Sequence, residues 1–231
     1  MNVTPSLPSP VVYVVDDDPT VRKSVAFLLN ILDVEVRPFA TAEDFLNNYH
    51  AGPASCLILD VRIPGMSGLE LQETLRRKGI EIPIIFVSGH GDIPMTVRAM
   101  RSGALDFLQK PYNDQVLLDS IGRALALCRQ KGLERERLTR IQAAYLMLSP
   151  REREVASMVV NGCANKVIAI DLGLSPKTVE AHRANAMEKM KARTLSELVR
   201  MFMALEQEGE DLSGEDAPPP VRPRQPDPIR V

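Results

Sequence analysis

The sequence has few cysteines and no long apolar run, and both absences exclude classes of protein. Cys56, Cys128 and Cys163 are odd in number, widely spaced and without metal-ligand spacing. We therefore expect reduced packing residues, not a disulfide framework or a zinc site. No apolar run approaches the roughly 18–20 residues of a membrane span. Residues 1–10 lack the basic and apolar regions of a signal peptide, so we expect a cytoplasmic protein without a membrane partner.

Charge is distributed unevenly along the 231 residues, although the formal net charge is only −2. Residues 1–131 carry 13 basic and 15 acidic side chains, whereas residues 139–205 carry 10 and 6. The basic excess of the second segment favours a polyanionic partner there. Residues 206–231 are acidic and then rich in proline, so they cannot bury a core and are expected to form a disordered tail.

Short β-branched runs alternate with helical patterns between residues 10 and 130. Five such repeats predict an α/β domain with a doubly wound, five-stranded parallel sheet of the flavodoxin-like type. The expected strands are Val11–Val15, Glu35–Phe39, Cys56–Leu59, Ile84–Val87 and Leu105–Leu108. The last helix of this domain is expected to begin at Asn113-Asp114 and to end near Gln130.

Residues 145–205 contain only helical periodicities, which predict a small all-α domain of four short helices. Ser149, Pro150 and Glu152 have the pattern of a capping box at the start of the first helix. Gly173 is expected to close the second helix, and Ser175 to cap the third. The charged residues 131–144 are expected to link the two domains, either as a helical extension or as an exposed linker.

Polar groups follow four of the expected strands at the points where each strand ends. Asp16-Asp17-Asp18 follows the first strand, Asp60 ends the third, Ser88 ends the fourth and Lys110-Pro111 follows the fifth. The carboxyl ends of parallel strands form one edge of a sheet, where ligands bind, so we expect these groups to converge. Each fragment alone is equally compatible with a solvated cap or turn. The occurrence of all four in this order favours one site.

The chemistry of these groups suits the transfer of a phosphoryl group to a carboxylate. The product is an acyl phosphate, whose negative charge needs a divalent cation and a lysine nearby. Asp16, Asp17 and Asp60 offer the oxygen ligands that Mg²⁺ prefers. Lys110 can pair with the phosphoryl oxygens, and Ser88 can donate a hydrogen bond to them. A cis Lys110-Pro111 bond would turn the lysine into the site.

Residues 10–130 resemble the receiver domain of two-component response regulators, which has a CheY-like fold. The motifs that carry this resemblance are Val14-Val15-Asp16-Asp17-Asp18, Leu59-Asp60-Val61-Arg62-Ile63-Pro64-Gly65-Met66-Ser67-Gly68, Phe86-Val87-Ser88-Gly89-His90 and Phe107-Leu108-Gln109-Lys110-Pro111. The resemblance implies that Asp60 accepts the phosphoryl group, that Lys110 pairs with it, and that Ser88 and Phe107 are switch residues. Phosphorylation would then alter a dimer face that includes Val97, Met100 and Arg101.

The same resemblance implies how Mg²⁺ is bound. Its ligands would be Asp17, Asp60 and the backbone carbonyl of Arg62, with Asp16 acting through water. Arg62 and His90 follow Asp60 and Ser88 by two residues. We expect these two side chains to govern water access, and so to set the lifetime of the acyl phosphate.

The second and third helices of the C-terminal domain have the arrangement that reads the DNA major groove. Lys177, Thr178 and Arg183 are candidate phosphate contacts, while Glu180 and Ala181 can contact base edges. The full set of candidate DNA-binding residues is Lys166, Lys177, Thr178, Glu180, Ala181, Arg183, Ala184 and Asn185. From composition alone, a solvated face of a protein-interaction domain is an equally good interpretation.

A resemblance to the LuxR-type helix-turn-helix over residues 145–205 favours DNA. Its motifs are Leu148-Ser149-Pro150-Arg151-Glu152-Arg153-Glu154-Val155, Gly162, Asn165-Lys166-Val167-Ile168-Ala169, Leu172-Gly173-Leu174-Ser175-Pro176-Lys177-Thr178-Val179 and His182. Ser88-Gly89-His90-Gly91-Asp92-Ile93-Pro94-Met95 and Glu180-Ala181-His182-Arg183-Ala184-Asn185 are similar to the FixJ subgroup. His182 is expected to be a buried packing residue and not a DNA contact.

The function expected from the two resemblances is phosphorylation-controlled transcription regulation. A sensor histidine kinase would phosphorylate Asp60, and the protein would then dimerise and bind promoter DNA. It would act with RNA polymerase, and the family resemblance favours activation of transcription over repression. One rival is a phosphatase that turns over an aspartyl phosphate, but the sequence lacks the long catalytic cap of such an enzyme. The other rival is a phospho-switch whose helical module binds a protein.

Overall fold

The chain divides into two compact units, with the boundary after Glu134. The structure is a computed structural model that describes residues 9–30, 34–50, 52, 54–89 and 93–212, with side chains as far as residue 207. Within these residues, no helix combines the length and the apolar character needed to cross a bilayer.

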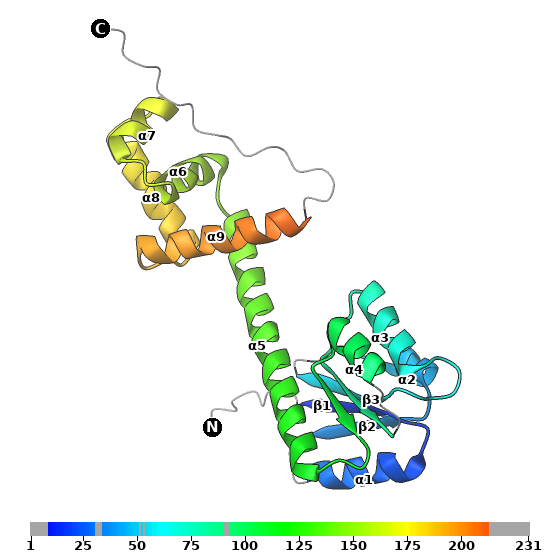
Figure 1. The fold of residues 1–231 in the computed structure, drawn as a ribbon. Coiled ribbons are helices and arrows are strands. Elements are labelled where there is room, and N and C mark those ends of the chain that lie inside the picture. The colour runs from blue at the N-terminus through cyan, green and yellow to red at the C-terminus, as the bar shows by residue number, and fades with distance from the viewer. Residues whose placement is uncertain (1–8, 31–33, 51, 53, 90–92, 213–231) are drawn as a thin grey trace, which may run out of the picture. The chain divides into compact units, whose positions relative to one another are not determined.

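The first unit is built around a five-stranded parallel sheet with the strand order β2-β1-β3-β4-β5 (Figure 1). The strands are β1 (Val11–Val15), β2 (Glu35–Phe39), β3 (Ser55–Asp60), β4 (Ile84–Ser88) and β5 (Asp106–Gln109). The helices that accompany them are α1 (Pro19–Leu29), α2 (Ala42–Asn48), α3 (Gly68–Arg77), α4 (Ile93–Arg101) and α5 (Asp114–Leu146). The predicted doubly wound α/β fold is confirmed.

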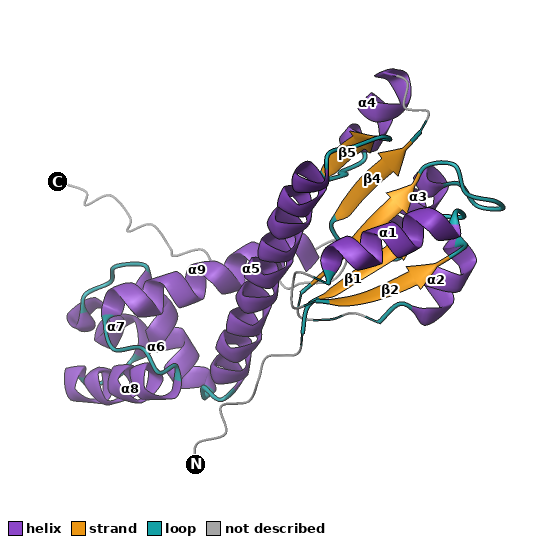
Figure 2. Ribbon diagram, turned by 90° about the horizontal axis from the view of Figure 1, so that it is seen from below, coloured by secondary structure: helices purple, strands orange, loops and turns teal. Residues whose placement is uncertain are grey.

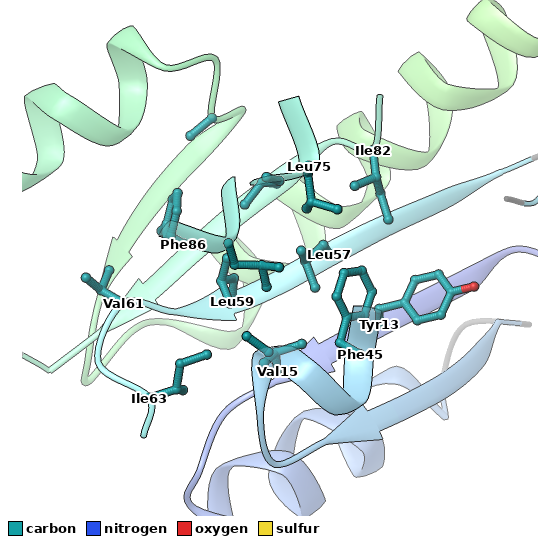
Figure 3. Packing of buried hydrophobic residues seen from close by; sticks show 14 of the residues in the cluster. Tyr13, Val15, Phe45, Leu57, Leu59, Val61, Ile63, Leu75, Ile82 and Phe86 are labelled. Carbon is teal, nitrogen blue, oxygen red and sulfur yellow. The ribbon is translucent and has the colours of Figure 1, made fainter. Parts of the chain in front are cut away.

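Helices cover both faces of the sheet, and each face buries its own apolar cluster. On one face, Val25 and Leu29 of α1 and Leu117 and Ile121 of α5 pack against the strands (Figure 2). The opposite face, which α2, α3 and α4 cover, contains the cluster shown in Figure 3, with Tyr13, Phe45, Leu57, Leu75 and Phe86 fully or almost fully buried. Continuously apolar strands are therefore required, because both faces of the sheet are buried.

The second unit contains α6 (Pro150–Val160), α7 (Asn165–Leu172), α8 (Pro176–Lys189) and α9 (Leu195–Leu212). The predicted capping box is present: the Ser149 side chain accepts from the Glu152 amide, and the Glu152 carboxylate accepts from the Ser149 amide. Gly173 closes α7 with a left-handed φ of 65°. Ser175 caps α8 by accepting a hydrogen bond from the Thr178 amide.

Two helix ends differ from the sequence prediction. Helix α5 does not end near Gln130 but continues to Leu146, so of the two alternatives for residues 131–144 the helical extension is confirmed. Ile141, Ala144 and Tyr145 supply an apolar stripe that packs in the second unit and stabilises these last turns. Helix α9 includes residues 206–212, which were assigned to the tail, because glutamate, glutamine and leucine favour helices. The rest of the predicted tail lies outside the described residues.

Candidate phosphoryl-acceptor site and nucleic-acid interface

The four polar strand ends meet at the carboxyl edge of the sheet. In the sheet order β1, β3, β4 and β5 are neighbours, so Asp16, Asp60, Ser88 and Lys110 lie at the ends of adjacent strands. Asp16, Asp60 and Ser88 are 3%, 8% and 1% exposed. Two carboxylates and a hydroxyl are therefore buried at the carboxyl edge of an otherwise apolar sheet.

Lys110 connects the two buried carboxylates. Its Nζ lies 2.6 Å from Asp16 Oδ2 and 2.6 Å from Asp60 Oδ2. Burial raises the pKa of Asp16, although the hydrogen bond from Lys110 opposes the rise. Burial alone would lower the pKa of Lys110, but the hydrogen bonds to Asp16 and Asp60 outweigh it and raise the pKa. The lysine is therefore held as a cation between two carboxylates.

Three carboxylates are close enough to share a metal ion. One ligand oxygen from each of Asp16, Asp17 and Asp60 lies within 4.8 Å of the others, and Asp17 is exposed to solvent. An all-oxygen set at a solvent-accessible edge fits a hard divalent cation that retains waters, as Mg²⁺ does. The Arg62 amide donates to Asp60 Oδ1 at 3.0 Å. The Arg62 carbonyl as a ligand remains a prediction.

The predicted switch residues are Ser88, at the end of β4, and Phe107, in β5. The main-chain carbonyl of Ser88 accepts from the Lys110 amide at 2.9 Å, which joins β4 to the residue that follows β5. Phe107 is half-buried, and its ring centroid lies 6.1 Å from that of Phe86. The expected cis Lys110-Pro111 bond is present. His90 lies outside the described residues, so its predicted role stays a prediction.

Two contributions to the site were missed from the sequence. Asp18, for which no separate role was predicted, is the N-cap of α1 and accepts a hydrogen bond from the Thr20 amide. Its amide donates to Asp16 Oδ1 at 2.9 Å, so it also orients a ligand carboxylate. The signal was available, because an aspartate directly before a proline at the start of a helix is a common N-cap pattern.

The predicted dimer residues lie on the exposed side of α4. Val97 and Met100 are 42% and 43% exposed, and Arg101 is also exposed. Ile93, which was not predicted, is 81% exposed in the same helix. Its spacing of four residues before Val97 places it one turn away on the same side. These residues form an apolar strip with a basic end.

In the second unit, α7 and α8 are joined by the Gly173 turn, as the helix-turn-helix pattern predicts. Val179, Ala186 and Met190 are buried, which confirms the predicted inner side of α8. The exposed candidates for DNA binding are Lys166, Lys177, Glu180, Ala181, Ala184 and Asn185. A solvent-facing set of this kind is what contact with a DNA groove requires.

Three of the α7–α8 predictions change in detail. Thr178 is half-buried, and its hydroxyl lies 2.8 Å from that of Ser175, so it serves the helix cap. Arg183 is half-buried and donates to Asn165 Oδ1 at 3.5 Å. His182 is half-buried and not fully buried, so the expected burial is only partial. The helix start and the α7–α8 contact therefore use side chains that the sequence had assigned to DNA alone.

An ion pair between α6 and α8 that joins an exposed lysine to a buried carboxylate was not predicted. Lys189 Nζ lies 2.6 Å from Glu152 Oε2, and Glu152 is 4% exposed. The hydrogen bond from Lys189, together with that from the Ser149 amide, lowers the pKa of Glu152. The pair fixes α8 relative to α6, and its two residues are 37 positions apart, beyond the reach of local patterns.

Comparison with known proteins identifies both units. Residues 12–122 match the model described as "Response regulator receiver domain", and residues 146–202 match "Bacterial regulatory proteins, luxR family". The transcriptional regulatory protein FixJ of Rhizobium meliloti is 46% identical over 193 residues, which cover 84% of this chain and 95% of that protein. The chain belongs to the FixJ-like response regulators.

Other similar proteins support the same family assignment. Nodulation protein W of Bradyrhizobium diazoefficiens is 45% identical over 84% of this chain and 86% of that protein. The solved structure of the response regulator StyR is 43% identical, with a TM-score of 0.76, and the match covers 84% of this chain and 98% of that one. A receiver joined to a LuxR-type domain implies a sensor kinase and DNA as partners.

Proposed function

We propose that this response regulator is a transcription factor switched by phosphorylation of Asp60. The observation that carries the proposal is the placement of Lys110 between Asp60 and Asp16, with Asp17 close to both. A cognate sensor histidine kinase supplies the phosphoryl group. The protein acts in the cytoplasm and turns over no external substrate, since the group passes only to and from its own Asp60.

The transfer forms one bond and breaks another. A carboxylate oxygen of Asp60 attacks phosphorus, and the bond from phosphorus to the histidine nitrogen of the kinase breaks. Mg²⁺, when bound by Asp16, Asp17 and Asp60, offsets the charge on the phosphoryl oxygens. Lys110 exchanges its bond to the Asp60 carboxylate for one to a phosphoryl oxygen, because that oxygen then carries the negative charge. Attack by water on phosphorus later restores Asp60 and releases phosphate.

The conformational response uses Ser88 and Phe107. A hydrogen bond from the Ser88 hydroxyl to a phosphoryl oxygen draws β4 toward the site, and Phe107 follows because it packs beside β4 against Phe86. This shift alters α4, whose exposed apolar strip then becomes the contact between two copies. Hydrophobic side chains that are about two-fifths exposed gain burial when a twofold dimer forms.

A dimer places two copies of α8 on a roughly palindromic site. Lys166 and Lys177 contact phosphates, which hold the protein on the duplex, and Glu180, Ala181, Ala184 and Asn185 face the bases. Val167 and Ile170 of α7 are 46% and 80% exposed and apolar, which suits contact with RNA polymerase. We expect activation of transcription.

The phosphorylation test uses acetyl phosphate and Mg²⁺ with the full chain. Asp60→Asn should abolish both the phosphorylated species on a phosphate-affinity gel and phosphate-dependent dimerisation in light scattering. Asp171→Asn is the matched control, because it removes an exposed carboxylate of α7, which lies outside the acceptor site. Phosphorylation of the Asp60→Asn protein at the wild-type level, or tight phosphate-independent dimers, would refute the proposal.

The DNA test measures binding of the phosphorylated protein to a mixed-sequence duplex at several salt concentrations. Affinity should fall steeply with salt, because phosphate contacts release counterions. An affinity that does not change with salt would instead favour the rival in which the helical module binds a protein.

A further inference from the structure

Arg22 is a charged side chain next to the acidic edge of the sheet, and it takes no part in the proposed transfer of the phosphoryl group. It lies in the first turns of α1 and is half-buried. Its guanidinium Nη1 donates a hydrogen bond to the main-chain carbonyl of Asp16. Within the described part of the chain, it lies within ion-pair distance of no carboxylate, although three aspartates precede α1.

The Asp16 carbonyl belongs to the peptide plane that joins Asp16 to Asp17. A peptide group is planar, so a bond that holds this carbonyl also restrains the positions of the Cα atoms of Asp16 and Asp17, from which the two side chains start. The other restraints on the segment are the Asp16 amide, which donates to the Phe39 carbonyl at 3.2 Å, and the Asp18 amide, which donates to Asp16 Oδ1 at 2.9 Å. The bond from Arg22 is the restraint that acts on the peptide between two of the three candidate cation ligands.

We propose that Arg22 is a positioning residue for the divalent cation, acting through the Asp16–Asp17 peptide. The inference rests on the proposed function, because it concerns the same carboxylates. A second effect of the arginine has the opposite sign. Its positive charge repels a cation from the aspartates, so a purely electrostatic role would make loss of Arg22 strengthen cation binding. A positioning role makes the same loss weaken it.

The test measures Mg²⁺ affinity of the full chain by calorimetry, without any phosphoryl donor. Wild type is compared with Arg22→Ala, Arg22→Lys and Lys23→Ala, in which an exposed neighbouring lysine is lost. Arg22→Ala should weaken Mg²⁺ binding about tenfold, as loss of groups that orient metal ligands does. Arg22→Lys should recover part of the affinity, since lysine can donate to the same carbonyl. Lys23→Ala should bind within about twofold of wild type, because its ammonium contacts no ligand.

Outcomes that overturn the inference are distinct from those that overturn the proposed function. If Arg22→Ala binds Mg²⁺ as tightly as wild type or more tightly, the positioning role is wrong, while phosphorylation of Asp60 stands. If wild type itself neither binds Mg²⁺ nor accepts a phosphoryl group, both proposals fail. Should Arg22→Ala not fold, Arg22→Lys decides, and tighter Mg²⁺ binding by Arg22→Lys would refute the inference. Equal weakening in Lys23→Ala would also refute it, because that effect would not depend on the bond from Arg22 to the Asp16 carbonyl.

Discussion

Gly68 is the residue whose substitution tests the architecture of the acceptor site most directly. It is the first residue of α3, and its amide donates to the Val61 carbonyl at 2.9 Å. A Cβ at this position would lie 2.2 Å from the Asp60 carbonyl oxygen and 3.1 Å from Leu59 Cγ. Ordinary contacts between carbon and oxygen begin near 3.4 Å. In Gly68→Ala, therefore, the main chain of Asp60 and the start of α3 must separate by about 1 Å.

The expected cost is that of overpacking a closely packed contact, about 1–3 kcal/mol. For a domain of this size, about 4 °C per kcal/mol converts this cost into a melting temperature lower by about 4–12 °C. The displaced group carries the acceptor carboxylate, and a misplacement of about 1 Å can reduce a rate by up to about a hundredfold. The rate of phosphorylation by acetyl phosphate should therefore fall more than the stability alone would suggest.

Gly122→Ala is the matched control for this prediction. Gly122 lies in α5, is exposed, and a Cβ there would meet no atom within 4 Å. Alanine favours a helix interior over glycine by about 1 kcal/mol, so this substitution should raise the melting temperature by a few degrees and leave phosphorylation unchanged. Differential scanning calorimetry and single-turnover phosphorylation check both variants. A Gly68→Ala protein as stable and as reactive as wild type would refute the close contact.

Three further predictions concern the side chains of Lys110, Glu152 and Lys177. Lys110→Ala should lower the stability of the first unit by about 2–3 kcal/mol at neutral pH, because it leaves two nearly buried carboxylates unpaired, and Mg²⁺ should restore part of that loss in thermal unfolding; no stabilisation by Mg²⁺ would contradict the shared cation site. Glu152→Gln should lower the free energy of unfolding by about 1–2 kcal/mol. This value is smaller than for a fully buried ion pair, because the Lys189 side chain is 40% exposed and solvent weakens the interaction. Because the folded pKa of Glu152 is below its ordinary value of 4.5, this difference should be full above that pH and vanish as pH falls through the folded pKa in urea unfolding series; a difference that persists in acid would argue against the pair. Lys177→Ala should weaken DNA binding evenly across sequences and reduce the salt dependence by about one phosphate contact in titrations, whereas Lys131→Ala should not; a loss of sequence preference alone would show that Lys177 reads bases.

Alternation of strand and helix patterns was enough to predict the sheet, since buried parallel strands must be apolar throughout. The strand-end positions of Asp16, Asp60, Ser88 and Lys110 followed from that topology. The Glu152–Lys189 pair and the contact of Arg22 with Asp16 could not be predicted, because each depends on the packing of one particular helix against another element. The end of α5 was missed because the stripe of Ile141, Ala144 and Tyr145 acquires a partner only in the folded second unit.

The loop between Asp60 and α3 contains two glycines that are required for different physical reasons, which the sequence alone does not distinguish. The motif from Pro64 to Gly68 contains two glycines, and Gly65 has a φ of 79°, a backbone conformation that favours glycine. Gly68 has no such backbone requirement; it is needed because α3 begins against the carbonyl of the acceptor aspartate. The two glycines therefore respond differently to alanine. At Gly65 the strain is mainly in the backbone, and a Cβ there would also lie 3.2 Å from Glu43 Oε1, at the end of a flexible side chain, whereas at Gly68 the strain reaches the main chain of Asp60. The same close approach means that a displacement of the Asp60 main chain, as the proposed phosphorylation would require, would press directly on the start of α3.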